Sequence, residues 1–425
     1  MATILSPMGV RIPFTPTYIH GEDMDTMNWS PQQAEALDRV AAWMKNKDKP
    51  YFYLAGFAGT GKTTLAKHFA EGVSGEVAYG SFTGKAASVM RSKGCDGATT
   101  IHRMIYTPAS KSGQKLRVLR DKLERAKSEK DDQLVMTLRI QVMDEVEKMK
   151  SPNFDLNADS NIRTASLVVV DEISQINDQM GKDLLSYNIP VLVLGDPAQL
   201  PPVRGTGFFT ERKPDMMLTE VHRQARESGI LRLATEIREG RQIDYCDYGD
   251  AEVVRKGDIE PEEVPEYDQV IVGKNKTRHA TNIRMRQLLG RTSALPEVGD
   301  RLLCLRNNHD LGLLNGEIYY AGTAARPLDE TVSMCIVPDG AKVESRGQWI
   351  EAWTAPLLGE RLEHWGQNKE VQEFGYGYVL TCHKSQGSQF DNVIVFDESS
   401  CFRADAARWL YTAVTRAAKR LTVVR

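Results

Sequence analysis

Short, unbroken apolar runs recur along most of the chain and are separated by segments with helical spacing. Unbroken rather than alternating runs are typical of parallel strands that are buried on both faces. Between them, apolar residues recur on one helix face, for example at Ala34, Leu37 and Val40. The pattern predicts an α/β fold with a second parallel-sheet unit that begins near residue 269. The clearest strand-like runs are 51–56, 76–82, 166–171, 190–195 and 269–273.

Three segments depart from this pattern. Residues 1–27 hold several prolines without a clear period, which predicts an extended or partly disordered arm. Residues 106–160 are dense in charge and follow helical spacing, so we expect an inserted helical hairpin that is either solvated or faces DNA. Residues 300–374 alternate apolar and polar positions, which predicts a small inserted β-barrel. Trp349 falls in that segment and is expected in its core rather than as a base-stacking platform.

Composition narrows the class of protein without naming it. Apolar residues make up 41% of the chain and charged residues 26%, both ordinary for a globular protein. Six scattered cysteines without a C-x-x-C pair disfavour a zinc site or a disulfide framework. The absence of a membrane-spanning run or a signal pattern leads us to expect a cytoplasmic setting. The net charge of −3 means that any nucleic-acid site must be a local groove rather than a basic coat.

A glycine-rich loop joins the first apolar run to a helix-like segment. Residues 56–63 fit the pattern G-x-x-x-x-G-K-T of a phosphate-binding loop. Its glycines let backbone N–H groups turn toward phosphate oxygens, and the helix start adds its positive dipole end. Lys62 can reach the β- and γ-phosphates of a nucleotide, and the Thr63 hydroxyl can bind Mg²⁺. The candidate nucleotide contacts in this stretch are Gly56, Ala58, Gly59, Thr60, Gly61, Lys62, Thr63 and Thr64.

Polar residues follow two later apolar runs, at the strand ends where open α/β sheets bind their ligands. Asp171 and Glu172 come directly after one strand. One of these carboxylates can hold Mg²⁺ beside Thr63, and the other can orient and deprotonate the water that attacks the γ-phosphate. Gln199 follows the next strand and can hydrogen-bond the γ-phosphate.

Further candidates are weaker when taken alone. Arg223 and Arg416 are possible arginine fingers, although Arg416 could equally be an exposed helix charge. Gln33 lies in the first turn of a predicted helix, where a solvated side chain is the expectation. Hydroxyl and basic residues at strand ends suit contacts to a phosphodiester backbone, although each one alone is more often a cap or a turn. These residues are Thr83, Lys85, Thr100 and His102, and a further polar loop holds Thr381, His383 and Lys384 before Gly387.

Taken together and in this order, the segments resemble a known enzyme family. The chain resembles superfamily 1 helicases of the RecD-like, B-type branch, and the phage Dda-like helicases within it. The resemblance spans about residues 28 to 425 and excludes the arm and the 106–160 insertion. The matching stretches are Gln33 with Ala36, GFAGTGKTT, FTGKAA, TTIH, VVVDEIS, VLVLGDPAQLPPV, LTEVHRQ, the LRNN…LNGE segment, YVLTCHKSQGSQFDNV and LYTAVTRA.

The resemblance implies two RecA-like domains that bind ATP and Mg²⁺ between them. It assigns Gln33 to the adenine, Asp171 to Mg²⁺, Glu172 to the catalytic base and Gln199 to γ-phosphate sensing. Arg223 and Arg416 would reach the phosphates across the cleft, near Gly387. The single-strand groove would be lined by Thr83, Lys85, Thr100, His102, Thr381, His383 and Lys384. The implied motor domains are 28–105 with 161–217, and 218–299 with 375–425, with the 106–160 insertion in the place of a strand-separating pin.

The implied function is ATP-dependent translocation along single-stranded DNA in the 5′ to 3′ direction, with unwinding of tailed duplexes. The expected enzyme is a monomer that works with replication or recombination proteins in a bacterial or phage-infected cell. Two alternatives stay open. One is an ATP switch that clamps or remodels protein–DNA complexes without separating strands, and the other is an RNA helicase.

Overall fold

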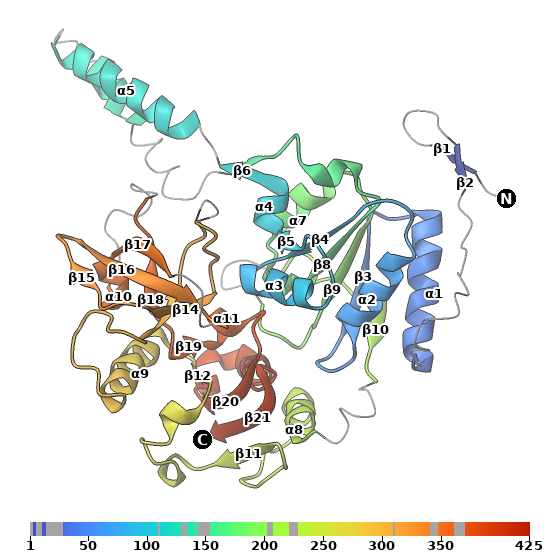
Figure 1. Ribbon diagram of the computed structural model, residues 1–425. Coiled ribbons are helices and arrows are strands. Elements are labelled where there is room, and N and C mark those ends of the chain that lie inside the picture. Colours follow the sequence, from blue (N-terminus) through green and yellow to red (C-terminus); the bar gives the residue numbers. More distant parts are fainter. Residues whose placement is uncertain are drawn as a thin grey trace.

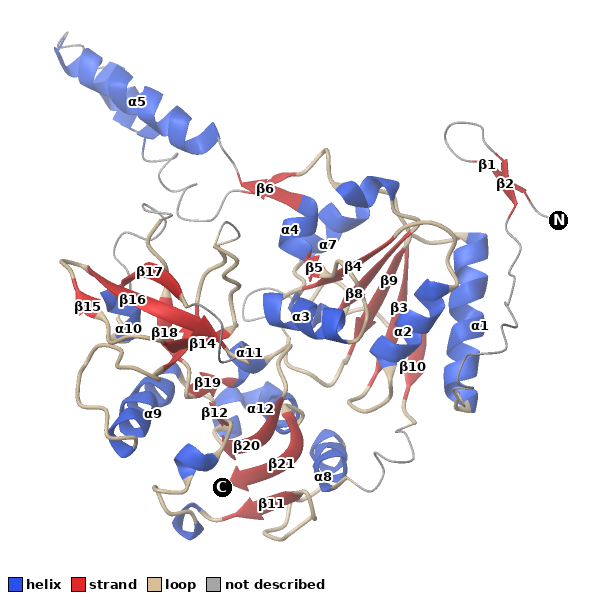
Figure 2. Ribbon diagram, viewed as in Figure 1, coloured by secondary structure: helices blue, strands red, loops and turns tan. Residues whose placement is uncertain are grey.

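Two parallel sheets and one antiparallel sheet organise the computed structural model of the chain (Figure 2). The structure describes residues 3–5, 11–13, 29–108, 111–128, 134–139, 141–142, 154–201, 207–220, 228–308, 311–340, 347–360 and 370–425.

The first sheet has six parallel strands in the order β10-β3-β9-β8-β4-β5. The strands are β3 (Tyr51–Gly56), β4 (Val77–Ser81), β5 (Thr99–Thr100), β8 (Leu167–Asp171), β9 (Val191–Gly195) and β10 (Met216–Leu218). All five residues of β9 are buried, as expected for a strand covered on both faces. The helices of this part are α1 (Pro31–Asn46), α2 (Lys62–Glu71), α3 (Gly84–Ser92), α4 (Ile101–Ile105) and α7 (Asp178–Leu185), with 3-10 turns η1 (Asn161–Thr164) and η2 (Ile173–Gln175).

Alternate side chains of β3 pack into different cores. Phe52 and Leu54 join the cluster that includes α1 and α2, whereas Tyr53 and Ala55 join the one that includes α4 and α7. Because successive strand residues point to opposite faces, β3 is held firmly between two helical layers. The loop that follows β3 therefore starts from a fixed point.

The second sheet has five parallel strands in the order β11-β21-β20-β12-β19. The strands are β11 (Ala251–Val254), β12 (Gln269–Val272), β19 (Val379–Thr381), β20 (Phe390–Phe396) and β21 (Ala417–Val424). Its helices are α8 (Gly229–Arg238), α9 (Asn275–Leu288), α11 (Cys382–Ser385) and α12 (Ala406–Val414), with 3-10 turns η4 (Lys256–Asp258), η5 (Val264–Glu266) and η6 (Ser399–Asp405). Helices α8 and α12 share one apolar core with strands of this sheet. Tyr411 and Thr412 of α12 accept hydrogen bonds from Ala58 and Leu200 of the first sheet's domain.

The third sheet is antiparallel, in the order β15-β16-β14-β13-β18, with β17 paired to β16. Its elements are β13 (Arg301–Cys304), β14 (Ile318–Ala321), β15 (Arg326–Pro327), β16 (Thr331–Pro338), β17 (Gln348–Trp353), α10 (Thr354–Leu357) and β18 (Phe374–Tyr376). Trp349 is 57% exposed, so the expectation that it belongs to the core is wrong. It lies on β17 with its side chain on the outer face of the sheet, where alternation along a strand places every second residue.

The insertion begins and ends as a two-stranded antiparallel pair, β6 (Tyr106–Pro108) with β7 (Phe154–Leu156). Helix α5 (Lys111–Ser128) projects away from the three sheets (Figure 1). In the N-terminal arm, β1 (Thr3–Leu5) pairs with β2 (Arg11–Pro13). Among the described residues, no helix combines the length and the apolar character needed to cross a bilayer.

Candidate nucleotide site between the two parallel sheets

The loop between β3 and α2 has the backbone of a phosphate cradle. Gly59 and Gly61 have φ values of 77° and 76°, a region that favours glycine. A Cβ added at Gly56 would lie 2.6 Å from Thr60 Oγ1 and 2.9 Å from Leu218 Cβ, so a side chain there would force the loop open. These glycines leave a concave backbone that can surround an anion.

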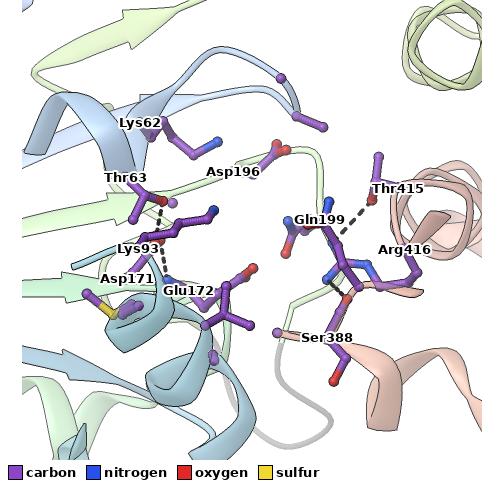
Figure 3. Close-up of a pocket in the computed structure, with 18 residues that line it drawn as sticks. Lys62, Thr63, Lys93, Asp171, Glu172, Asp196, Gln199, Ser388, Thr415 and Arg416 are labelled. Carbon is purple, nitrogen blue, oxygen red and sulfur yellow. Dashed lines mark hydrogen bonds between the residues drawn. The ribbon is translucent and has the colours of Figure 1, made fainter. Parts of the chain in front are cut away.

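Lys62 and Thr63 begin α2 and point toward the carboxyl edge of the sheet. The Lys62 ammonium donates to the carbonyls of Gly56 at 2.7 Å and Phe57 at 3.0 Å. The Thr63 hydroxyl donates to Asp171 Oδ2 at 2.7 Å. The cation therefore lies over the loop, and a hydroxyl and a carboxylate lie together beside it (Figure 3).

Thr63 and Asp171 fit a Mg²⁺ ion that also binds the nucleotide. Magnesium prefers oxygen ligands and usually takes one or two protein groups, with phosphates and waters as the rest. The described residues contain no group of three His, Cys, Asp or Glu side chains that could hold a metal by themselves. Thr63 and Asp171 would thus hold the ion through its phosphate complex.

Glu172 has an unusual backbone and a shifted acidity. Its φ of 57° places a non-glycine residue in the left-handed region, which is a strained state that occurs often at functional sites. Burial raises the pKa of Glu172, and the charges of Asp171 and Asp196 raise it further, whereas Arg416 and Lys62 oppose the shift. A carboxylate with a raised pKa is a better proton acceptor than an ordinary glutamate.

The loop after β9 supplies two more side chains. Asp196 is buried, and burial raises its pKa, although the Lys62 charge and a hydrogen bond from Tyr411 act against the shift. Gln199 is 9% exposed, and its Oε1 has no hydrogen-bond partner within the described residues. A buried amide with an unused atom beside a phosphate cradle fits a ligand-facing role.

Arg416 enters the pocket from the second parallel sheet, just after α12. Its guanidinium donates to the Thr412 carbonyl at 3.1 Å, to Thr415 Oγ1 at 3.2 Å and to the Ser388 carbonyl at 3.3 Å. All three partners are uncharged, and the side chain is 4% exposed. A buried cation whose hydrogen bonds go to uncharged groups is suited to an anionic ligand.

One pocket brings most of the predicted nucleotide residues together. Figure 3 shows residues of the first parallel sheet facing Arg416 across it. Its lining includes the predicted residues Ala58, Gly59, Lys62, Thr63, Asp171, Glu172, Gln199, Gly387 and Arg416. Gly56, Thr60, Gly61 and Thr64 belong to the same loop and helix start without lining the pocket. Arg223 lies outside the described residues.

Gln33 does not line this pocket. It is 3% exposed, so the expectation of a solvated side chain is wrong. Its Oε1 accepts from the Ser30 N–H at 3.1 Å and its amide donates to the Thr60 carbonyl at 3.1 Å. Ser30 and Gln33 form a reciprocal cap at the start of α1. The Gln33 side chain is buried because this start of α1 packs against the phosphate loop through the bond to Thr60.

Several pocket residues were not predicted from the sequence. Lys93, Ser388 and Thr415 line it together with Asp196. Asp196 directly follows an apolar strand, which is the signal that could have singled it out. Lys93 follows α3 without any comparable signal, because only the packing of α3 beside β4 brings it to the pocket.

The predicted DNA-contact residues lie at the carboxyl ends of strands in both parallel sheets. Thr83 and Thr100 cap helices α3 and α4 by accepting the N–H of Ala86 and Arg103. Each threonine therefore has the capping role that is the more common one for such residues. Thr381 is the residue before α11. A Cβ added at Gly387 would lie 2.8 Å from Thr83 Oγ1, so the two groups meet across the domains.

The histidines and the lysine among the predicted DNA-contact residues differ in charge and exposure. Burial lowers the pKa of His102 and of His383, so both imidazoles are neutral at physiological pH. His102 lies 5.8 Å from the Phe82 ring, in an edge-to-face arrangement. Partial desolvation by the surrounding protein lowers the pKa of Lys384, and the like charge of Arg278 lowers it further. Lys384 is nevertheless exposed and open to an anionic partner.

The fold and the site define a P-loop NTPase with two RecA-like parallel-sheet domains. The chain belongs to the AAA domain family, whose model matches residues 28–258 and thus more than half of the chain. A second model, the UvrD-like helicase C-terminal domain, matches residues 376–424.

One curated relative is a DNA helicase. The ATP-dependent RecD2 DNA helicase of Deinococcus radiodurans is 25% identical over 418 residues, which cover 92% of this chain and 48% of that protein. The chain therefore spans about half the length of this relative.

Two solved structures share the fold. A Pif1 helicase studied for unwinding at forked double-stranded DNA has a TM-score of 0.53 and 18% identity, covering 93% of this chain and 92% of that one. Pif1 helicase from Candida albicans has a TM-score of 0.51 and 19% identity, covering 93% and 94%. The predicted α/β fold with parallel-sheet domains is thereby confirmed.

Proposed function

We propose that the protein is an ATP-dependent DNA helicase that moves 5′ to 3′ along single-stranded DNA and unwinds tailed duplexes. The observation that carries this proposal is one pocket in which Thr63, Asp171 and Glu172 of one parallel-sheet domain face Arg416 of the other. A triphosphate bound there would touch both domains at once. Its cleavage would therefore change how the domains hold each other.

Each side chain has a distinct role in hydrolysis. The phosphate loop and Lys62 bind the phosphates, and Glu172 accepts a proton from the attacking water. Gln199 hydrogen-bonds the γ-phosphate, and Arg416 stabilises the charge that builds on it. When bound, Mg²⁺ neutralises charge on the β- and γ-phosphates. We assign Gln33 to the adenine and Arg223 to the phosphates by family resemblance.

The single-strand groove is proposed at the strand ends that hold Thr83, Lys85, Thr100, His102, Thr381, His383 and Lys384. Both parallel-sheet domains contribute to this set, and Gly387 lies in the nucleotide pocket, three residues after Lys384. Movement between the domains would then alter the grip on the strand. Contacts of this kind are mostly with phosphates, so binding should tolerate sequence and weaken with salt.

Finer assignments rest on resemblance alone. We place the enzyme with the Dda-like helicases, as a cytoplasmic monomer that works beside replication or recombination proteins. We assign the 106–160 insertion to the place of the strand-separating pin.

The first expected result is that single-stranded DNA stimulates ATP hydrolysis and that only 5′-tailed duplexes are unwound. The measurement compares ATPase rates with and without a single strand, and then strand displacement on duplexes with a 5′ or a 3′ tail. Unwinding of 3′-tailed duplexes alone would overturn the polarity. Streptavidin displacement without strand separation would favour an ATP switch, and stimulation by RNA alone would favour an RNA helicase.

The second expected result is that ATPase activity falls on acidification at a pH above the ordinary glutamate value of 4.5. Glu172 must be deprotonated to act as a base, so activity is present above its raised pKa and is lost below it. The measurement is kcat at saturating ATP from about pH 8 down to about pH 5.

The variant Asp196→Asn tests whether protonation of Glu172 causes this loss of activity, which forms the acidic limb of the pH profile. Removal of a neighbouring negative charge should lower the pKa of Glu172 and move the acidic limb to lower pH. A limb that stays in place, or that moves to higher pH, would assign it to another group.

A further inference from the structure

A buried tyrosine of the second domain bonds to the phosphate loop of the first. Tyr411 lies in α12, and its side chain is 2% exposed. Its hydroxyl accepts the Ala58 N–H at 3.0 Å and donates to Asp196 Oδ2 at 2.6 Å. One hydroxyl group thus satisfies a backbone donor and a carboxylate that belong to two different pocket loops.

The bond from Tyr411 to Asp196 is the stronger of the two. Asp196 is 4% exposed, and a hydrogen bond from a hydroxyl to a buried carboxylate is stronger than one between neutral groups. Loss of the hydroxyl would leave the Ala58 N–H and one carboxylate oxygen without this partner. An unsatisfied buried group costs more than the bond itself contributes, so the arrangement has a strong preference for the bonded state.

The next residue of α12 makes a second bond across the same interface. Thr412 Oγ1 accepts the Leu200 N–H at 2.9 Å, and the Leu200 carbonyl accepts from the Gln386 amide at 3.1 Å. The loop that carries Asp196 and Gln199 is therefore held by the second domain at both ends. Tyr411 extends this contact to the phosphate loop by its bond to the Ala58 N–H, and Arg238 of α8 also lies over the ring of Phe57 in that loop, 3.6 Å from its centroid.

The same helix positions the arginine of the pocket. The Thr412 carbonyl accepts from Arg416 Nε at 3.1 Å, and Arg416 lies five positions after Tyr411. The last turn of α12, which ends at Val414, and the short turn after it thus separate the hydroxyl that touches the phosphate loop from the guanidinium that faces the pocket. Displacement of one end of this segment must displace the other.

We propose that Tyr411 is a positioning residue that sets where Arg416 lies relative to the phosphate loop. This inference rests on the proposed ATP hydrolysis. Tyr411 acts through α12 by anchoring it to the Ala58 N–H and to Asp196, so that Arg416 meets the phosphates in the orientation that hydrolysis requires. A shift of about 1 Å in such a group is enough to slow a reaction strongly.

The test is Tyr411→Phe, which keeps the buried ring and removes only the hydroxyl. We expect kcat for DNA-stimulated ATPase to fall about tenfold, the equivalent of about 1.4 kcal/mol in barrier height, while the Kd for a fluorescent ATP analogue changes less than about threefold. A role in folding alone would not separate kcat from nucleotide affinity.

The matched control is Tyr378→Phe. Tyr378 is also buried and donates its hydroxyl to a buried carboxylate, Asp300 Oδ1, at 2.9 Å, but it does not line the nucleotide pocket. This control should leave kcat and Kd close to those of the wild type. A similar loss in both variants would mean that any buried tyrosine–aspartate bond is needed for stability.

A double variant asks whether Tyr411 acts through Arg416. In an Arg416→Ala background, Tyr411→Phe should change the single-turnover rate less than about twofold, because coupled residues are not additive. Additive losses, an unchanged kcat in Tyr411→Phe, or tighter ATP binding would each overturn the inference. A wild-type protein without ATPase activity would instead overturn the proposed function itself, and this inference with it.

Discussion

Replacing Lys62 with alanine is expected to reduce ATP turnover by at least about 10²–10³-fold, the loss typical when one preorganised group is removed from a developing charge. The Lys62 ammonium lies at the mouth of the phosphate loop, where it donates to the carbonyls of Gly56 and Phe57. A nucleotide would offer it phosphate oxygens in place of these carbonyls. The measurement is steady-state ATPase in the presence of single-stranded DNA.

A lysine on the same helix serves as the control. Lys67 lies outside the pocket and pairs with Glu71 at 3.5 Å on the surface of α2. Lys67→Ala should keep nearly full activity, because exposed ion pairs contribute at most about 1 kcal/mol to stability. Near-normal turnover in Lys62→Ala, with a thermal midpoint like that of the wild type, would remove the central assignment of the phosphate loop.

The second large effect is expected for Glu172→Gln, which should retain ATP binding and lose about 10²–10⁴-fold in hydrolysis. The amide has nearly the shape of the carboxylate, so the left-handed backbone at this position is not disturbed further. It cannot accept the proton of the attacking water. It also removes one negative charge from a pocket that holds Asp171 and Asp196, so binding of the anionic nucleotide should not weaken.

Two measurements separate binding from chemistry in this variant. Equilibrium titration with a fluorescent ATP analogue reports binding, and single-turnover hydrolysis reports the chemical step. Glu71→Gln, on the exposed face of α2, is the matched substitution and should change neither quantity. Equal losses of binding and hydrolysis in Glu172→Gln would mean that the carboxylate is structural.

A contact near the pocket suggests how ATP hydrolysis is coupled to DNA binding. Gln386 donates to the Leu200 carbonyl and accepts from the Gln175 amide, and it follows Lys384 of the proposed DNA groove by two residues. Gln175 ends η2, the turn that begins just after Glu172. One hydrogen bond between the domains, from Gln175 to Gln386, thus joins the chain segment that follows the proposed base to the segment that follows Lys384.

Local sequence was sufficient wherever the chemistry lies within one strand–loop–helix unit. The glycines of the phosphate loop, Lys62 and Thr63 are neighbours along the chain, and their geometry follows from φ angles that glycine allows. Asp171 and Glu172 were found because apolar strands carry polar residues to the same edge of a parallel sheet. In these cases a few adjacent residues set the position of each side chain.

Contacts between residues that are far apart along the chain could not be predicted from the sequence. Tyr411 meets Ala58 although 353 positions separate them, and its sequence context is that of an ordinary buried helix residue. Lys93 reaches the pocket only through the packing of α3, and Gln33 is buried only because α1 lies behind the phosphate loop. Trp349 is exposed because alternation along β17 directs it outward, which composition could not indicate.

The sequence by itself determined the α/β fold, the phosphate loop and the carboxylates beside it, because each depends on residues close together in the chain. Only the tertiary structure decided which further second-domain groups contact this part of the first domain, since packing of the two sheets selects Tyr411 and Thr412 from many similar side chains and places Arg416, a candidate already named from the sequence, at the pocket. The physical reason is that strand and helix patterns specify which face of an element is buried. They do not specify which distant element covers it.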